Sequence, residues 1–133
     1  MNSTPPAIGL VLLTHGQIGR ALIDVAEFIL DRSLADIRVV SFRQSADEKT
    51  GDEEIRKAID SANLGHGVLV LTDISGASPC NQVMRLPFST EVAVVSGLNL
   101  AMLIRAWNYR DKPLCQLADL AVEGAIRDIR KCQ

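Results

Sequence analysis

Two residues whose side chains could act together in group transfer, His15 and Asp73, each stand close behind an unbroken apolar run, residues 8–13 and residues 68–71 respectively. A neutral imidazole nitrogen is a nucleophile. A carboxylate bonded to the opposite ring nitrogen fixes the tautomer and stabilises the positive charge that develops during attack. The pair therefore indicates nucleophilic chemistry at His15, provided that the fold brings the two runs together.

A loop of small residues follows Asp73, in which Gly76, Ala77 and Ser78 precede Pro79. Proline is favoured in the first turn of a helix, so a helix is expected to begin here. Small residues let a ligand approach the backbone closely, and a helix N-terminus offers unpaired amides and a positive dipole end to a phosphate. The loop therefore predicts a phosphate cradle, with the Ser78 hydroxyl as an additional donor.

Each of these signals also has an ordinary structural explanation. A single histidine at a strand end is more often solvated than catalytic, an aspartate after a strand commonly caps a loop or a helix, and Ser–Pro is a routine helix start. His66, between two glycines, is expected to be a turn residue rather than a catalyst. The residues alone therefore leave both interpretations open.

The hydrophobic pattern predicts four strands, separated by amphipathic helices. The strands are expected at residues 8–13, 37–42, 68–71 and 91–96. The helices are expected over residues 17–30, from near Asp52 to residue 64, over 80–85 or 86, over 98–107, and after the break at 111–113. The polar residues 43–50 are expected to form an exposed loop.

This alternation predicts an α/β fold: one domain over residues 1–133, with a doubly wound, mainly parallel sheet of four or five strands and helices on both faces. In the flavodoxin-like strand order, ligands bind outside the carboxyl ends of the strands, between strands one and three. His15 and Asp73 end those two strands. Neighbouring strands lie about 4.8 Å apart, so the two side chains are expected to meet.

Composition excludes several other classes of protein. A net charge of -2 provides no general attraction for nucleic acid or for an acidic membrane surface. The N-terminus lacks a basic region and a long apolar run, so neither a signal peptide nor a membrane span is expected. The three cysteines are far apart in the sequence, which favours the reducing cytoplasm. With two histidines, no thiolate cluster and no Walker motif, we expect neither a metal nor a cofactor.

Three stretches resemble, in the same order, the enzyme IIA component of the mannose-type (mannose/fructose/sorbose) phosphoenolpyruvate-dependent sugar phosphotransferase system. They are residues 8–16 with Thr–His–Gly, residues 67–81 with the aspartate and Ser–Pro, and residues 94–103, which are similar to that family's valine-rich strand and Gly–Val–Asn–x–Pro–Met–Leu segment. The resemblance covers nearly the whole chain. It implies a phosphotransferase that works through a phosphohistidine intermediate.

The family's roles can be carried over residue by residue. The resemblance makes His15 the residue that accepts phosphate from the histidine-containing phosphocarrier protein and passes it to an enzyme IIB component. Asp73 becomes its catalytic partner, and Ser78 becomes the residue that bonds the phosphoryl group, beside the Gly76 and Ala77 amides of the predicted cradle. The loop departs from the family's frequent Gly–Gly, because Ala77 stands at the second position.

Other functions and assemblies stay open. The chain ends without a fused IIB unit, so its acceptor is expected to be another protein, in sugar transport or in a regulatory phosphorelay. One alternative is the phosphoryl-donor subunit of a dihydroxyacetone kinase, whose family usually shows Ser–His–Ser at this position. Another is a non-catalytic regulatory binding module, which the set of His15, Asp73 and Ser78 disfavours. A homodimer is expected; residues 98–103 and Trp107 are interpreted first as core and second as a dimer contact.

Overall fold

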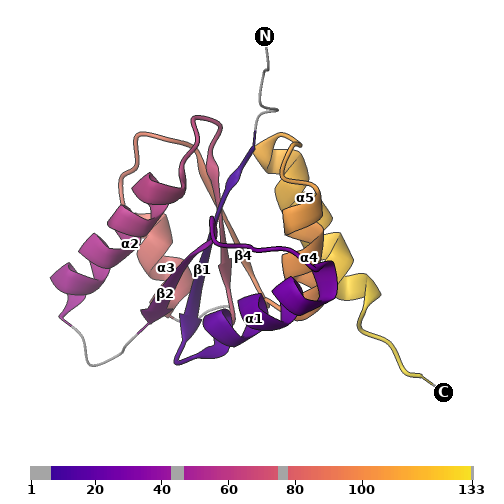
Figure 1. The fold of residues 1–133 in the computed structure, drawn as a ribbon. Helices are drawn as coiled ribbons and strands as arrows, with labels where there is room; N and C mark the ends of the chain where they lie inside the picture. Colours follow the sequence, from indigo (N-terminus) through magenta and orange to yellow (C-terminus); the bar gives the residue numbers. More distant parts are fainter. Residues whose placement is uncertain (1–6, 43–46, 75–77, 133) are drawn as a thin grey trace, which may run out of the picture.

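A parallel sheet of four strands forms the centre of the molecule (Figure 1). The computed structural model describes residues 7–42, 47–74 and 78–132. Its elements are, in chain order, β1 (Gly9–His15), α1 (Ile18–Leu30), β2 (Arg38–Phe42), α2 (Glu48–Ala62), β3 (Val68–Thr72), α3 (Ser78–Arg85), β4 (Val92–Ser96), α4 (Leu100–Asn108) and α5 (Leu114–Arg127). The strand order is β2-β1-β3-β4, and every neighbouring pair is parallel.

The helices cover both faces of the sheet, with α1, α4 and α5 on one face and α2 and α3 on the other (Figure 1). Alternate residues of β1 point into two separate apolar cores: Leu10 and Leu12 pack under α1, α4 and α5, whereas Val11 and Leu13 pack under α2 and α3. The predicted α/β class, the doubly wound parallel sheet and the helices on both faces are therefore confirmed.

The predicted start of α2 near Asp52 is wrong, because the helix begins at Glu48 and includes residues 48–50, which were expected to lie in a loop. Its first turn is closed by a bond from the Gly51 N–H to the Asp47 carbonyl, 3.0 Å long. The first buried apolar residue of α2 is Ile55. A solvent-facing first turn carries no apolar periodicity, so the sequence pattern missed it.

The start of α4 also differs slightly from the prediction, at Leu100 instead of Leu98. Asn99 is the N-cap, and its side-chain oxygen accepts a hydrogen bond of 2.8 Å from the Met102 N–H. Met102, Leu103 and Trp107 are buried in the core beside α5, as the first interpretation of this segment expected. The capping asparagine therefore turns the chain so that α4 enters the core.

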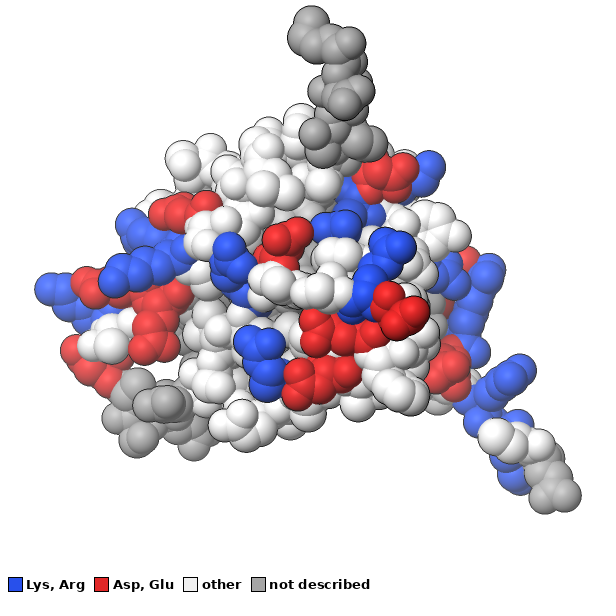
Figure 2. Space-filling view, viewed as in Figure 1, with Lys and Arg blue, Asp and Glu red and all other residues white. Residues whose placement is uncertain are grey.

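The surface is mixed in charge and the helices are short. Figure 2 shows acidic and basic side chains interspersed over the face that it presents, without a broad area of one sign. In the part of the chain that the structure describes, no helix is long and apolar enough to span a membrane.

Candidate active site at the carboxyl ends of the strands

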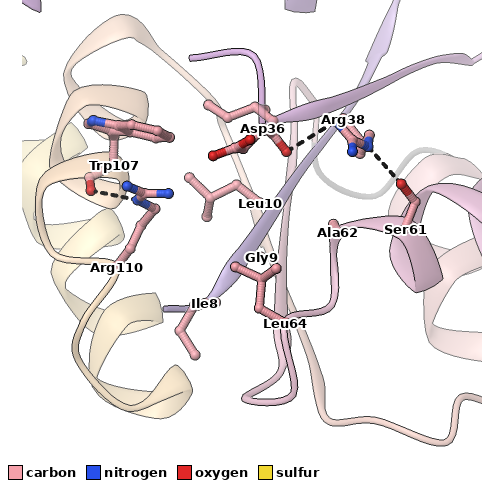
Figure 3. A pocket seen from close by; sticks show the side chains of 11 residues that line it. Ile8, Gly9, Leu10, Asp36, Arg38, Ser61, Ala62, Leu64, Trp107 and Arg110 are labelled. Carbon is pink, nitrogen blue, oxygen red and sulfur yellow. Dashed lines mark hydrogen bonds between the residues drawn. The ribbon is translucent and has the colours of Figure 1, made fainter. Parts of the chain in front are cut away.

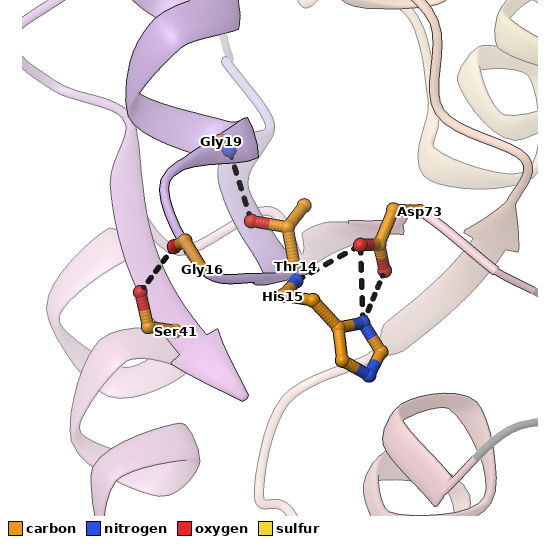
Figure 4. A network of polar contacts seen from close by, with 6 residues as sticks. All are labelled: Thr14, His15, Gly16, Gly19, Ser41 and Asp73. Atoms are coloured by element: carbon orange, nitrogen blue, oxygen red, sulfur yellow. Dashed lines mark hydrogen bonds and ion pairs between the residues drawn. The ribbon is translucent and has the colours of Figure 1, made fainter. Parts of the chain in front are cut away.

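His15 and Asp73 meet at the carboxyl edge of the sheet, as the sequence predicts (Figure 4). β1 and β3 are direct neighbours, with Leu13 opposite Thr72, so the residues that follow each strand lie side by side. The His15 backbone N–H donates to Asp73 Oδ2 over 2.9 Å. The ring Nδ1 of His15 lies 3.1 Å from Oδ2 and 3.2 Å from Oδ1. One carboxylate therefore holds both the backbone and the ring of His15.

The turn that carries His15 is fixed by its neighbours on both sides. Thr14 is fully buried, and its hydroxyl oxygen accepts a 3.0 Å hydrogen bond from the Gly19 N–H at the start of α1. The Ser41 hydroxyl, from β2, donates to the Gly16 carbonyl over 2.8 Å. Gly16 has a φ of 54°, in the left-handed region that glycine adopts easily. These bonds position His15 between β1 and α1.

The geometry sets which ring nitrogen of His15 is available. Burial raises the pKa of Asp73, but the bonds from the backbone and ring of His15 lower it more, and the pKa lies below its ordinary value. An ionised carboxylate only accepts hydrogen bonds, so Nδ1 carries the hydrogen. Figure 4 shows the other nitrogen, Nε2, on the far side of the ring from Asp73. The His15 side chain is 34% exposed, and Nε2 takes no part in the bonds to Asp73.

An aromatic ring that the sequence interpretation did not single out lies against His15. Phe42 ends β2 directly opposite His15 in the register of the two strands. The two ring centroids are 5.1 Å apart, with an interplanar angle of 64°. Phe42 therefore restricts the imidazole on the side away from β3. Its place at the end of the predicted strand 37–42 could have revealed it.

The second buried threonine near the site, Thr72, has a hydroxyl without a partner. It is fully buried on β3, next to Asp73, and its Oγ1 forms no hydrogen bond within the described residues. Thr72 and Leu13 stand opposite each other in the register. Side chains alternate along a strand, so Thr72 faces the same side of the sheet as Leu13 and His15.

The predicted phosphate-binding loop is described only at its end. Gly76 and Ala77 lie outside the described residues, and so does the side chain of Ser78, although α3 begins at that residue. The helix itself is anchored, because Gln82 Nε2 donates to Asp52 Oδ1 of α2 over 2.6 Å and Val83 is buried. The phosphate-binding role of these three residues stays a prediction.

Other candidate residues lie apart from this site. His66 is exposed in the turn before β3, at the opposite end of that strand from Asp73. The cysteines at positions 80, 115 and 132 are free. Across the described ranges, no group of three or more histidine, cysteine, aspartate or glutamate side chains is arranged to hold a metal ion.

Comparison with known families decides what kind of protein carries this pair. Residues 9–118 match the family model described as the fructose IIA component of the phosphotransferase system. The chain belongs to this family. The mannose-specific EIIAB component of the phosphotransferase system from Escherichia coli strain K12 is 29% identical over 119 residues. That match covers 87% of this chain but only 36% of the relative, so the chain spans little more than a third of that relative's length.

Solved structures agree with the mannose-type enzyme IIA assignment. The mannose/sorbose-specific IIA subunit from Enterococcus faecalis superposes with a TM-score of 0.83 at 25% identity, and 96% of each chain is covered. A sigma-54 interaction domain protein from Enterococcus faecalis has a TM-score of 0.69 at 16% identity, over 94% of this chain and 97% of its own. At that identity the likeness shows the fold alone. The predicted resemblance to mannose-type enzyme IIA is therefore confirmed.

Proposed function

We propose that this enzyme IIA component is a phosphoryl carrier that is transiently phosphorylated on Nε2 of His15. The observation that carries the proposal is the double contact of His15 with the Asp73 carboxylate, which holds the Nδ1–H tautomer. A neutral imidazole held in this way presents an unshared electron pair at Nε2. Its partial exposure lets a phosphorylated protein reach it.

The transfer follows from this geometry. Nε2 of His15 attacks the phosphorus of a phosphohistidine on the donor protein, in line with the nitrogen that leaves. The new Nε2–P bond forms as the donor's N–P bond breaks, and the electron pair of the broken bond stays on the donor nitrogen. The ring of His15 becomes positively charged, and the Asp73 carboxylate, bonded to Nδ1–H, stabilises that charge. The same steps in reverse pass the phosphoryl group to an acceptor.

The phosphoryl oxygens need donors that the ring itself lacks. In the proposal these are the hydroxyl of Ser78, at which α3 begins, and the backbone amides of Gly76 and Ala77. Such a site works without a metal or a cofactor, because fixed amides and the helix dipole compensate the phosphate charge.

Membership of the family supports a proposal for the partners. We assign the donor as the histidine-containing phosphocarrier protein and the acceptor as an enzyme IIB component, in sugar transport or in a regulatory phosphorelay. The name of the mannose-specific relative, EIIAB, combines the designations IIA and IIB, which supports an enzyme IIB component as the acceptor. Transfer between these proteins is proposed to take place in the cytoplasm, with this chain as a homodimer.

The decisive experiment is phosphorylation with purified components. The protein is incubated with phosphoenolpyruvate, enzyme I and the phosphocarrier protein, and the label is tested for acid lability and alkali stability. We expect labelling of the wild type, none in His15→Ala, and full labelling of His66→Ala as the matched control. Labelling that persists in His15→Ala would sink the assignment. A wild-type protein that takes no label would favour the regulatory binding module.

A further inference from the structure

A pocket lies at the opposite edge of the sheet from His15, where β1 and β2 begin (Figure 3). Its volume is about 120 Å³. Since a water molecule in the liquid takes about 30 Å³, the pocket has room for about four waters or a ligand of a few carbon atoms. Pockets for drug-sized or nucleotide ligands typically measure about 300 Å³ or more, so this pocket suits a smaller ligand. Phosphoryl transfer at His15 does not use this pocket.

The floor of the pocket is apolar. It is lined by Ile8, Leu10 and Ile37, which are buried, and by Trp107, which is 8% exposed. Leu64, which follows the C-cap of α2, also lines it but is 59% exposed. A hydrocarbon group in the pocket would cover Leu64 and contact the floor. The floor therefore favours a ligand with an aliphatic part.

On one side of the pocket stands Arg110, which is stacked on an indole ring (Figure 3). Its guanidinium carbon lies 3.4 Å from the ring centroid of Trp107, and its Nε donates to the Trp107 carbonyl over 3.2 Å. The two Nη groups have no hydrogen-bond partner within the described residues. Stacking fixes the plane of the guanidinium, and a fixed fork of two N–H groups matches a carboxylate in a bidentate arrangement.

The opposite side of the pocket adds a second fixed cation, Arg38 (Figure 3). Its Nε donates to the Ser61 hydroxyl oxygen over 2.7 Å, and an Nη group donates to the Ala35 carbonyl over 3.1 Å. Asp36 is the one acidic residue among those that line the pocket. The lining has a formal charge of +1, from two arginines and one aspartate, in a chain of net charge -2, and Asp36 acts electrostatically on Arg110. This balance selects an anion over a cation.

We propose that this pocket is a second ligand site, for a small aliphatic carboxylate that bonds to the Arg110 fork and lays its hydrocarbon part on Leu10 and Leu64. The Nη groups of Arg110 stand at one side of the pocket and apolar side chains form its floor, which matches an ion that is charged at one end only. A tetrahedral phosphate presents oxygens on every side and would place some of them against the apolar floor, where they lose their hydration.

The chain supplies its own reporter, because Trp107 is the only tryptophan. Sodium butyrate is titrated into the protein at constant ionic strength, with sodium chloride and inorganic phosphate as parallel titrations. The readouts are tryptophan fluorescence and the heat of binding. We expect a saturable response to butyrate with a dissociation constant of about 1 mM, and no saturation with chloride or phosphate. No saturation with butyrate at about 50 mM, or equal binding of phosphate, would overturn the proposal.

Variants locate the response. Arg110→Gln is expected to weaken butyrate binding by about tenfold or more, since a charge-assisted bidentate contact is lost. Arg110→Lys keeps the charge without the fork and is expected to bind more weakly than the wild type. Arg105→Gln is the matched control, because Arg105, in α4, also lies over an aromatic ring, 5.6 Å from the centroid of Tyr109, and does not line this pocket. Unchanged affinity in folded Arg110→Lys and Arg110→Gln proteins would refute the site.

This site is independent of the proposed phosphoryl transfer. His15→Ala is therefore expected to bind butyrate as the wild type does, even though it takes no phosphate. Loss of butyrate binding in a folded His15→Ala protein would place the ligand at the carboxyl edge of the sheet instead, and would contradict the proposed site. The thermal unfolding of every variant is measured alongside, to show that each one is folded.

Discussion

The backbone and the ring of His15 bind the same carboxylate: Oδ2 of Asp73 accepts the His15 backbone N–H over 2.9 Å and lies 3.1 Å from Nδ1. The backbone bond places the carboxylate, and the ring bond sets the tautomer. The two functions can be separated by mutation, because an amide oxygen can still accept the backbone bond but carries no negative charge.

Asp73→Asn is therefore expected to slow phosphorylation of His15 without unfolding the protein. A charge-assisted hydrogen bond contributes about 1.5–3 kcal/mol, which corresponds to a rate about 10- to 160-fold lower. The measurement is the initial rate of labelling by the phosphorylated phosphocarrier protein. Asp60→Asn, at an exposed position of α2, is the control and should label at the wild-type rate. An unchanged rate in Asp73→Asn would remove Asp73 from the mechanism.

Asp73 also predicts how stability depends on pH. Its folded-state pKa lies below the ordinary value of 3.8, so the contribution of the ionised group to stability is present above pH 3.8 and is lost as the pH falls through the folded-state pKa. We expect the difference in unfolding free energy between wild type and Asp73→Asn to shrink as the pH falls below 3.8. Urea denaturation at a series of pH values measures it. A difference in unfolding free energy that grows on acidification would mean that the folded-state pKa of Asp73 is raised instead of lowered.

The close approach of β1 and α1 behind His15 can be tested at Gly19. A Cβ atom there would lie 2.7 Å from Oγ1 of Thr14, which is fully buried, and 3.1 Å from Cγ1 of Val39, which is partly buried. Gly19→Ala is expected to lower the unfolding free energy by about 1–3 kcal/mol, although alanine is the better helix former. In Gly51→Ala, also helical, the nearest atom to the Cβ is Gln82 Nε2, 3.2 Å away at the end of a flexible side chain. If Gly19→Ala is no less stable than Gly51→Ala, the close contact at residue 19 does not destabilise the protein.

The sequence predicted those parts of the site that depend on strand order. His15 and Asp73 were expected to meet because both end buried runs, and neighbouring parallel strands end at the same edge. Phe42 was missed, although it ends the predicted strand beside His15, because a single aromatic residue at a strand end carries no periodic signal. The bond between Thr14 and Gly19 was missed for a different reason: a contact between a side chain and the backbone leaves no trace in the apolar pattern. Such contacts depend on the backbone path, which only coordinates give.

The two buried threonines at the ends of β1 and β3 give the last prediction. Thr14 and Thr72 are both fully buried, but the Thr14 hydroxyl oxygen accepts a bond from the Gly19 N–H, whereas Thr72 Oγ1 has no partner among the described residues. An unpaired buried hydroxyl costs about 1–3 kcal/mol, so Thr72→Val is expected to raise the unfolding free energy, by about 1 kcal/mol. Thr14→Val leaves the Gly19 N–H without an acceptor and is expected to lower the unfolding free energy by about 1–3 kcal/mol. Chemical denaturation of the two variants measures both changes, and an equal loss of stability in both would show that the Thr72 hydroxyl is hydrogen-bonded in the folded protein.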